Sequence, residues 1–126
     1  NLGYHPGTVL VDEPMIFELP HNKKWEPANY NDEYMGPVVL KKALAKSLNV
    51  ISAKLIFKVK PAEVVKTARK FGFTSLLREN FSLALGATGA SPIELASAYS
   101  VIANLGEYRD PFYVSKIEDY QGNILY

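Results

Sequence analysis

The chain has 126 residues, of which 48% are hydrophobic and 21% charged, the proportions of an ordinary globular protein. Its 14 basic and 13 acidic residues leave a formal net charge of +1, so the basic footprint of a nucleic-acid-binding protein is missing. No apolar run reaches the roughly 18 residues that cross a bilayer, and the absence of cysteine excludes disulfides and thiolate metal sites. The chain begins at Asn1 without Met or a signal region, so we expect it to be part of a longer protein.

The first 36 residues are predicted to form a loop-rich arm. Five of the eight prolines and three of the eight glycines fall within residues 1–37. Both residue types interrupt regular structure, and the polar run from His21 to Lys24 also favours a loop. One short strand is expected over Thr8–Val11, where apolar and β-branched residues are consecutive.

Residues 37–106 are predicted to form a helical core. The first helix is expected to begin at Pro37, because proline suits the first helical position. Apolar residues recur on one face of this helix, with lysines on the other: Leu40, Ala43 and Leu44. The second helix, over residues 50–59, is apolar on several sides and is therefore expected to be buried.

Two further helices complete the predicted core. The third begins near Pro61 and stops at Gly72, and its apolar face comprises Val64, Val65, Ala68 and Phe71. The fourth starts at a capping box, in which the Ser91 hydroxyl accepts from the N–H of Glu94 and the glutamate reaches back to Ser91. Its inward face is expected to comprise Leu95, Ala98, Tyr99 and Ile102, and Gly106 ends it.

Residues 111–126 are predicted to start a β-hairpin, with a turn over residues 119–122. The second strand reaches the end of the chain without a partner, which leaves a free strand edge. We therefore expect self-association of the isolated chain, or coverage of this edge by other parts of a longer protein. The fold class predicted is mainly α with a short β-hairpin.

Common catalytic and metal-binding patterns are scarce. His5 and His21 lie in loop-like sequence without acidic or histidine partners at ligand spacing, so no metal site is predicted. The carboxylates near the N-terminus are interpreted as solvated charge rather than an acid/base pair: Asp12, Glu13, Glu26, Asp32 and Glu33. The run Gly86-Ala87-Thr88-Gly89 lacks the Lys-Ser/Thr that completes a phosphate-binding loop. No cofactor is predicted.

The remaining candidate is Ser47-Leu48-Asn49. It lies between the lysine-bearing helix and the apolar helix, and residues two apart would face nearly opposite ways if both stayed helical. A non-helical junction can instead turn Ser47 and Asn49 into one partly open cleft. The alternative is that one of them only caps the apolar helix, since both residue types are favoured caps.

The order of motifs resembles the class A penicillin-binding proteins over nearly the whole chain. The N-terminal half carries Val11-Asp12-Glu13-Pro14, Trp25-x-Pro27-x-Asn29-Tyr30, Gly36-Pro37-Val38-x-Leu40 and Ala43-Leu44-x-x-Ser47-x-Asn49. The C-terminal half carries Lys70-Phe71-Gly72-Phe73, Ser82-Leu83-Ala84-Leu85-Gly86-Ala87, Ser91-Pro92-x-Glu94-Leu95-Ala96-x-Ala98-Tyr99 and Ala103-Asn104-x-Gly106. This family uses Ser-x-x-Lys, Ser-x-Asn and Lys-Thr-Gly, of which only the second occurs here.

The resemblance implies a fold, an activity and two site residues. The chain would be the helical part of the mixed α/β penicillin-binding transpeptidase fold, which is serine β-lactamase-like, and residues 1–126 one partial domain. The family's D,D-transpeptidases act on peptidoglycan stem peptides ending in D-Ala-D-Ala, and β-lactams trap their nucleophilic serine. Ser47 would relay a proton to the leaving nitrogen, and Asn49 would hold the nucleophile's lysine and bind the substrate amide.

The same resemblance places the parent protein on the outer face of the bacterial cytoplasmic membrane. Without Ser-x-x-Lys and Lys-Thr-Gly, this chain is expected to be inactive alone and to need the remainder of the transpeptidase domain. Two alternatives stay open: a non-catalytic binding or scaffold module with this fold, and a β-lactam-recognising hydrolase or sensor. Motifs flanking this segment would separate the enzyme from the scaffold.

Overall fold

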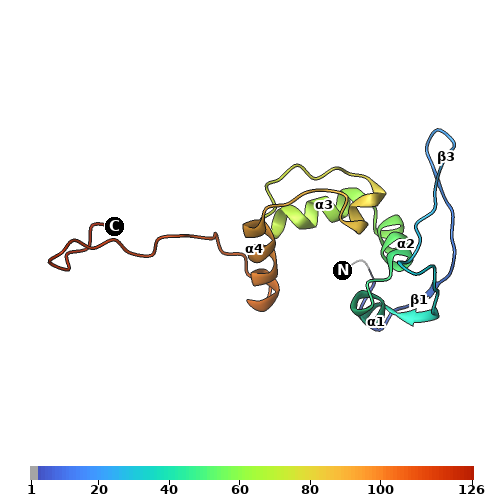
Figure 1. Ribbon diagram of the computed structural model, residues 1–126, viewed down its shortest axis with the longest axis horizontal. Helices are drawn as coiled ribbons and strands as arrows, with labels where there is room; N and C mark the ends of the chain where they lie inside the picture. The colour runs from blue at the N-terminus through green and yellow to red at the C-terminus, as the bar shows by residue number, and fades with distance from the viewer. Residues whose placement is uncertain (1–2) are drawn as a thin grey trace. The chain divides into compact units, whose positions relative to one another are not determined.

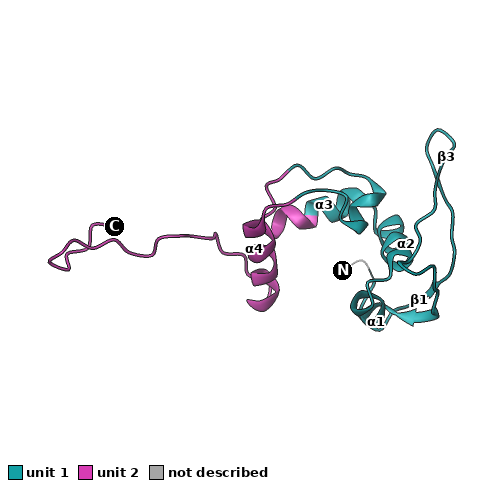
Figure 2. Cartoon of the chain, in the orientation of Figure 1, with its two compact units in different colours: residues 1–66, 76–89 teal, residues 67–75, 90–126 magenta. Residues whose placement is uncertain are grey.

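The computed structural model describes residues 3–126, which divide into two compact units (Figures 1 and 2). Among these residues, the first unit comprises residues 3–66 and 76–89, and the second comprises residues 67–75 and 90–126. Within the described residues, no helix is both long enough and apolar enough to cross a membrane.

The N-terminal arm, which was predicted to be loop-rich, contains more β-strand than its prolines and glycines suggest. β1 (Val9–Asp12) pairs antiparallel with β4 (Gly36–Val39), and β2 (Phe17–Leu19) pairs antiparallel with β3 (Lys23–Trp25). The strand expected at Thr8–Val11 is therefore confirmed within one residue, but the loop expected at residues 23–24 is wrong. Strands of three or four residues carry too little alternation to be predicted, and β1 finds its partner only in a distant segment.

The start of the first helix is also corrected by this pairing. Pro37 lies in β4 opposite Val11, and α1 (Leu40–Ala45) begins three residues later. Proline has no N–H to donate, so an edge strand accommodates it as well as a helix start does. The inward face of α1 is narrower than expected, because Leu44 is 82% exposed.

α2 (Asn49–Val59) joins the two apolar clusters of the first unit. Its N-terminal half contributes Ile51 to a core with three other buried residues: Val38, Ala43 and Leu48. Its C-terminal half contributes Phe57, whose ring centroid lies 5.0 Å from Phe17 and 4.9 Å from Phe81. Phe81 opens the short 3₁₀ helix η1 (Phe81–Leu85). The buried helix predicted here is confirmed.

α3 (Pro61–Lys70) has the predicted limits, and the four residues of its predicted apolar face are all half-buried. In the second unit, α4 (Pro92–Ala103) has the predicted capping box. Its inward face is displaced by about one residue from the prediction, since Leu95, Tyr99 and Ile102 are exposed. The face that is buried comprises Glu94, Ser97, Ala98 and Val101.

The buried carboxylate of Glu94 explains this displacement. It accepts hydrogen bonds from the backbone N–H groups of Thr74, Ser75 and Ser91 and from their hydroxyls, at 2.6–3.0 Å. These hydrogen bonds hold the pKa of Glu94 well below its usual range. The hydrogen bond from the Ser75 hydroxyl contributes most, and the backbone N–H donors add to it. A buried charge has to face its donors, so the polar network sets the rotation of α4 in place of the apolar stripe.

The predicted hairpin at residues 111–126 forms only in part. An isolated antiparallel bridge joins Glu118 to Ile124, and the carboxylate of Asp119 accepts from the N–H groups of Gln121 and Asn123 at 2.8 and 2.9 Å. The turn is therefore present where expected, but residues 111–126 contain no extended β-strand. Most large apolar side chains of this segment are exposed: Phe112, Tyr113, Val114, Ile117, Tyr120, Ile124, Leu125 and Tyr126.

Candidate active site

Ser47 lies at a Schellman turn that ends α1. The N–H of Leu48 donates to the carbonyl oxygen of Ala43, and the N–H of Ser47 donates to that of Leu44, both at 3.0 Å. Ser47 occupies the left-handed position of this motif, with φ of 54°, where glycine is usual. Leu48 then turns into the core beside Ala43. The local sequence therefore forms a sharp corner that leaves Ser47 exposed.

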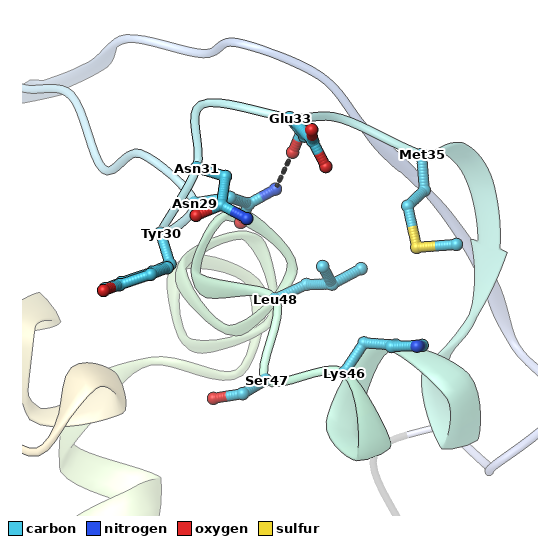
Figure 3. Close-up of a pocket in the computed structure, with 8 residues that line it drawn as sticks. All are labelled: Asn29, Tyr30, Asn31, Glu33, Met35, Lys46, Ser47 and Leu48. Atoms are coloured by element: carbon cyan, nitrogen blue, oxygen red, sulfur yellow. Dashed lines mark hydrogen bonds between the residues drawn. The ribbon is translucent and has the colours of Figure 1, made fainter.

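An open cleft of about 400 Å³ borders this corner (Figure 3). Its lining comes from the α1–α2 junction and from the segment between β3 and β4: Asn29, Tyr30, Asn31, Glu33, Met35, Lys46, Ser47 and Leu48. Figure 3 shows Ser47 and Lys46 on one side of Leu48, with Asn29 and Glu33 on the other. Within residues 3–126 the Ser47 hydroxyl makes no hydrogen bond, so it is free to exchange protons with a bound molecule.

Asn49 is the first residue of α2, and it lies outside the lining of this cleft. Its Nδ2 donates to the carbonyl oxygen of Ala28 at 2.9 Å. The predicted helix junction is therefore confirmed, but the expectation that both side chains face one cleft is met only by Ser47. The capping alternative is wrong, because Leu48 is the N-cap residue of α2 and no side chain of the junction caps the helix.

Asp12 and Asn29 form a buried polar pair next to this junction. The Asp12 side chain is 1% exposed, so its interpretation as solvated charge is wrong. Its two carboxylate oxygens each lie 3.0 Å from Asn29 Nδ2, and Oδ2 also accepts from the N–H of Met35 at 3.0 Å. Asn29 Oδ1 accepts from the N–H of Val50 at 3.2 Å. These two residues carried the family resemblance, but only the distant hydrogen bonds reveal their role.

Within residues 3–126, no group of three or more potential metal ligands gathers. Beside β1, Lys54 Nζ forms an ion pair with Glu13 Oε1 at 3.0 Å. Lys54 Nζ also donates to the carbonyl oxygen of Val11 at 2.6 Å. Lys54 therefore links α2 to β1 at Val11, the residue next to Asp12.

The profile of the penicillin binding protein transpeptidase domain matches residues 8–124. The chain belongs to this family. Penicillin-binding protein 1A of Pseudomonas aeruginosa is 35% identical over 126 residues, and penicillin-binding protein 2D of Bacillus subtilis is 36% identical over 126 residues. These alignments include 98% of this chain and span only 15% and 18% of those relatives.

Two solved penicillin-binding proteins share the fold of this chain. Penicillin-binding protein 1A from Haemophilus influenzae superposes with a TM-score of 0.88 at 33% identity, over 98% of this chain and 19% of that one. PonA1 from Mycobacterium tuberculosis, solved in complex with penicillin V, superposes with a TM-score of 0.81 at 24% identity, over 98% of this chain and 36% of that one. The predicted fold class, the helical part of the mixed α/β transpeptidase domain, is confirmed.

Membership of the transpeptidase family allows the short motifs of this sequence to be compared with the three motifs of the family. Among the family's three motifs, only Ser-x-Asn has a sequence match within these 126 residues, at Ser47-x-Asn49. Lys66-Thr67-Ala68 lies on α3 and lacks the glycine of Lys-Thr-Gly. The candidate site is therefore the cleft at Ser47, with Asn49 held beside it.

Proposed function

We propose that this segment supplies the Ser-x-Asn element of a serine D,D-transpeptidase that cross-links peptidoglycan stem peptides. The observation that carries the proposal is the exposed Ser47 hydroxyl, placed on an open cleft by a left-handed turn that serine adopts at a cost. A residue whose only role was structural would be replaced by glycine there at no loss. Family membership supplies the reaction class.

The reaction is acyl transfer. A nucleophilic serine from Ser-x-x-Lys attacks the penultimate carbonyl of D-Ala-D-Ala, the amide bond breaks, and the departing D-alanine nitrogen takes up a proton. An amine of a neighbouring stem then accepts the acyl group and the serine regains its proton. Ser47 is suited to deliver the proton to the leaving nitrogen, because a hydroxyl both donates and accepts at neutral pH.

Asn49 has a supporting role in the same proposal. One N–H of its amide is engaged by Ala28, which fixes the side chain, while Oδ1 makes no hydrogen bond within residues 3–126. Oδ1 is therefore available to the lysine of Ser-x-x-Lys, and the second N–H to a substrate carbonyl. A site of this kind belongs to a parent enzyme on the outer face of the bacterial cytoplasmic membrane, where its substrate lies.

The test is covalent labelling with a fluorescent penicillin. A full-length transpeptidase that carries this segment should acquire label on its nucleophilic serine, and the Ser47→Ala variant should acquire it about 100-fold more slowly. The 126-residue chain alone should acquire none, since it holds no Ser-x-x-Lys. Stoichiometric labelling of this chain alone, or a full-length protein that binds stem peptides without acylation, would contradict the proposal and favour a scaffold.

A further inference from the structure

The amide of Asn29 joins three segments that are distant in sequence. Its side chain is 7% exposed, and it donates to Asp12 on β1 and to the carbonyl oxygen of Glu33 at 2.9 Å while it accepts from Val50 on α2. Both donors and the acceptor of the amide are therefore engaged. A buried amide with all its groups satisfied has one orientation, because any rotation leaves a polar group unpaired.

Asp12 determines which way that amide points. A carboxylate only accepts hydrogen bonds, so the NH₂ of Asn29 has to face it and the Oδ1 has to face Val50. Asp12 is itself fixed at the end of β1, opposite Gly36, and its Oδ2 also receives the N–H of Met35. The β1–β4 ladder therefore holds one end of a rigid connection whose other end is the first turn of α2.

The first turn of α2 needs this connection because it lacks a cap of its own. Helices leave their first N–H groups without intrahelical partners, and the N-cap side chain usually accepts from one of them. Here the N-cap residue is Leu48, whose side chain belongs to the core, and Asn29 receives the N–H of Val50 instead. The neighbouring carbonyl of Ala28 receives Asn49 Nδ2. Ala28 and Asn29, which are adjacent in sequence, thus hold both Asn49 and the first turn of α2.

We propose that the Asp12–Asn29 pair is the positioning unit of the Ser47-x-Asn49 element. The pair sets the rotation of the first turn of α2 about its axis, and with it the direction of Asn49 and the corner at Ser47. This inference rests on the proposed acyl-transfer function. Asp12 and Asn29 act through the junction, because the polar groups of the Asn29 side chain are all engaged within the protein. A misplacement of about 1 Å costs an enzyme up to ~100-fold in rate, so loss of the pair should slow acylation.

Exchange of the two side chains tests the pair. Asn29→Asp places two carboxylates face to face, and Asp12→Asn sets a second NH₂ group against that of Asn29, so each single variant loses part of the match. The double variant again sets a donor opposite an acceptor and keeps an acceptor for Val50 N–H and Met35 N–H, but it loses the donor to Glu33 and brings a carboxylate oxygen against that carbonyl oxygen. The measurement is the acylation rate constant of a full-length transpeptidase with fluorescent penicillin, separated from the dissociation constant of the initial complex.

Each single exchange should lower the acylation rate constant with a smaller change in initial binding, Asn29→Asp by up to about 100-fold, and the double exchange should be about 10-fold faster than Asn29→Asp. Hydrogen exchange at the Val50 N–H should become faster in the single variants, where acylation slows, and slower again in the double variant. If the single exchanges do not accumulate as folded protein, Asn29→Ser decides, since its shorter side chain reaches neither Asp12 nor Val50 and brings no like charges together; it should lower the acylation rate constant in the same way.

The matched control is Glu94→Gln, which weakens a buried carboxylate network of the second unit. It should lower the melting temperature and leave the acylation rate constant of the folded protein unchanged. Asn29 and Asp12 variants that behave like Glu94→Gln would overturn the positioning role while the proposed function stands. A wild-type protein that binds penicillin without acylation would instead overturn the proposed function.

Discussion

Replacement of Ser47 by glycine should make the protein more stable and less active. Ser47 holds φ at 54°, and a left-handed conformation costs a residue with a Cβ atom roughly 1–2 kcal/mol. Glycine avoids that strain but loses about 0.5–1 kcal/mol more in backbone entropy on folding. The difference predicts a gain of up to about 1.5 kcal/mol in the free energy of unfolding. The same change removes the hydroxyl on which the proposed proton transfer depends.

The assay compares Ser47→Gly with Ser47→Ala in a full-length transpeptidase. Ser47→Gly should raise the melting temperature of the domain by about 2 °C, whereas alanine keeps the strain and should leave it nearly unchanged. Both variants should slow acylation by fluorescent penicillin about 100-fold. Two results would refute the reasoning: a lower melting temperature for Ser47→Gly, which denies the strained turn, or acylation within about 3-fold of wild type, which denies the role of the hydroxyl.

Three further predictions concern the second unit. The lowered pKa of Glu94 stabilises the folded state above the group's ordinary pKa of 4.5, so local unfolding of α4, followed by hydrogen exchange, should become easier as pH falls below that value. Glu94→Gln should remove this acid dependence. Gly72→Ala should cost about 2 kcal/mol in urea unfolding, because φ is 90° and the new Cβ would lie 2.3 Å from a ring carbon of Tyr108; Tyr108→Ala should restore part of the loss. The isolated chain should self-associate through residues 112–126, and a monodisperse monomer in sedimentation with a cooperative melt above about 50 °C would contradict this.

Elements with local signals were predictable from the sequence. The capping box of Ser91 and Glu94, the limits of α3 and the junction at Ser47 all depend on residues within about four positions of one another. Such patterns operate before any tertiary contact forms. The order of motifs added the family, and with it the roles expected of Ser47 and Asn49.

Contacts between distant segments were decided only by the tertiary structure. Pro37 belongs to a strand because β4 meets β1, and α4 is rotated because Glu94 has to face Thr74 and Ser75. The sequence pattern indicates that Asp12 is a solvated acid. Asp12 is nevertheless buried, because Asn29, 17 residues away, donates a hydrogen bond to it. Burial of a polar group is favourable only when its partner is present, and no local pattern states where the folded chain brings that partner.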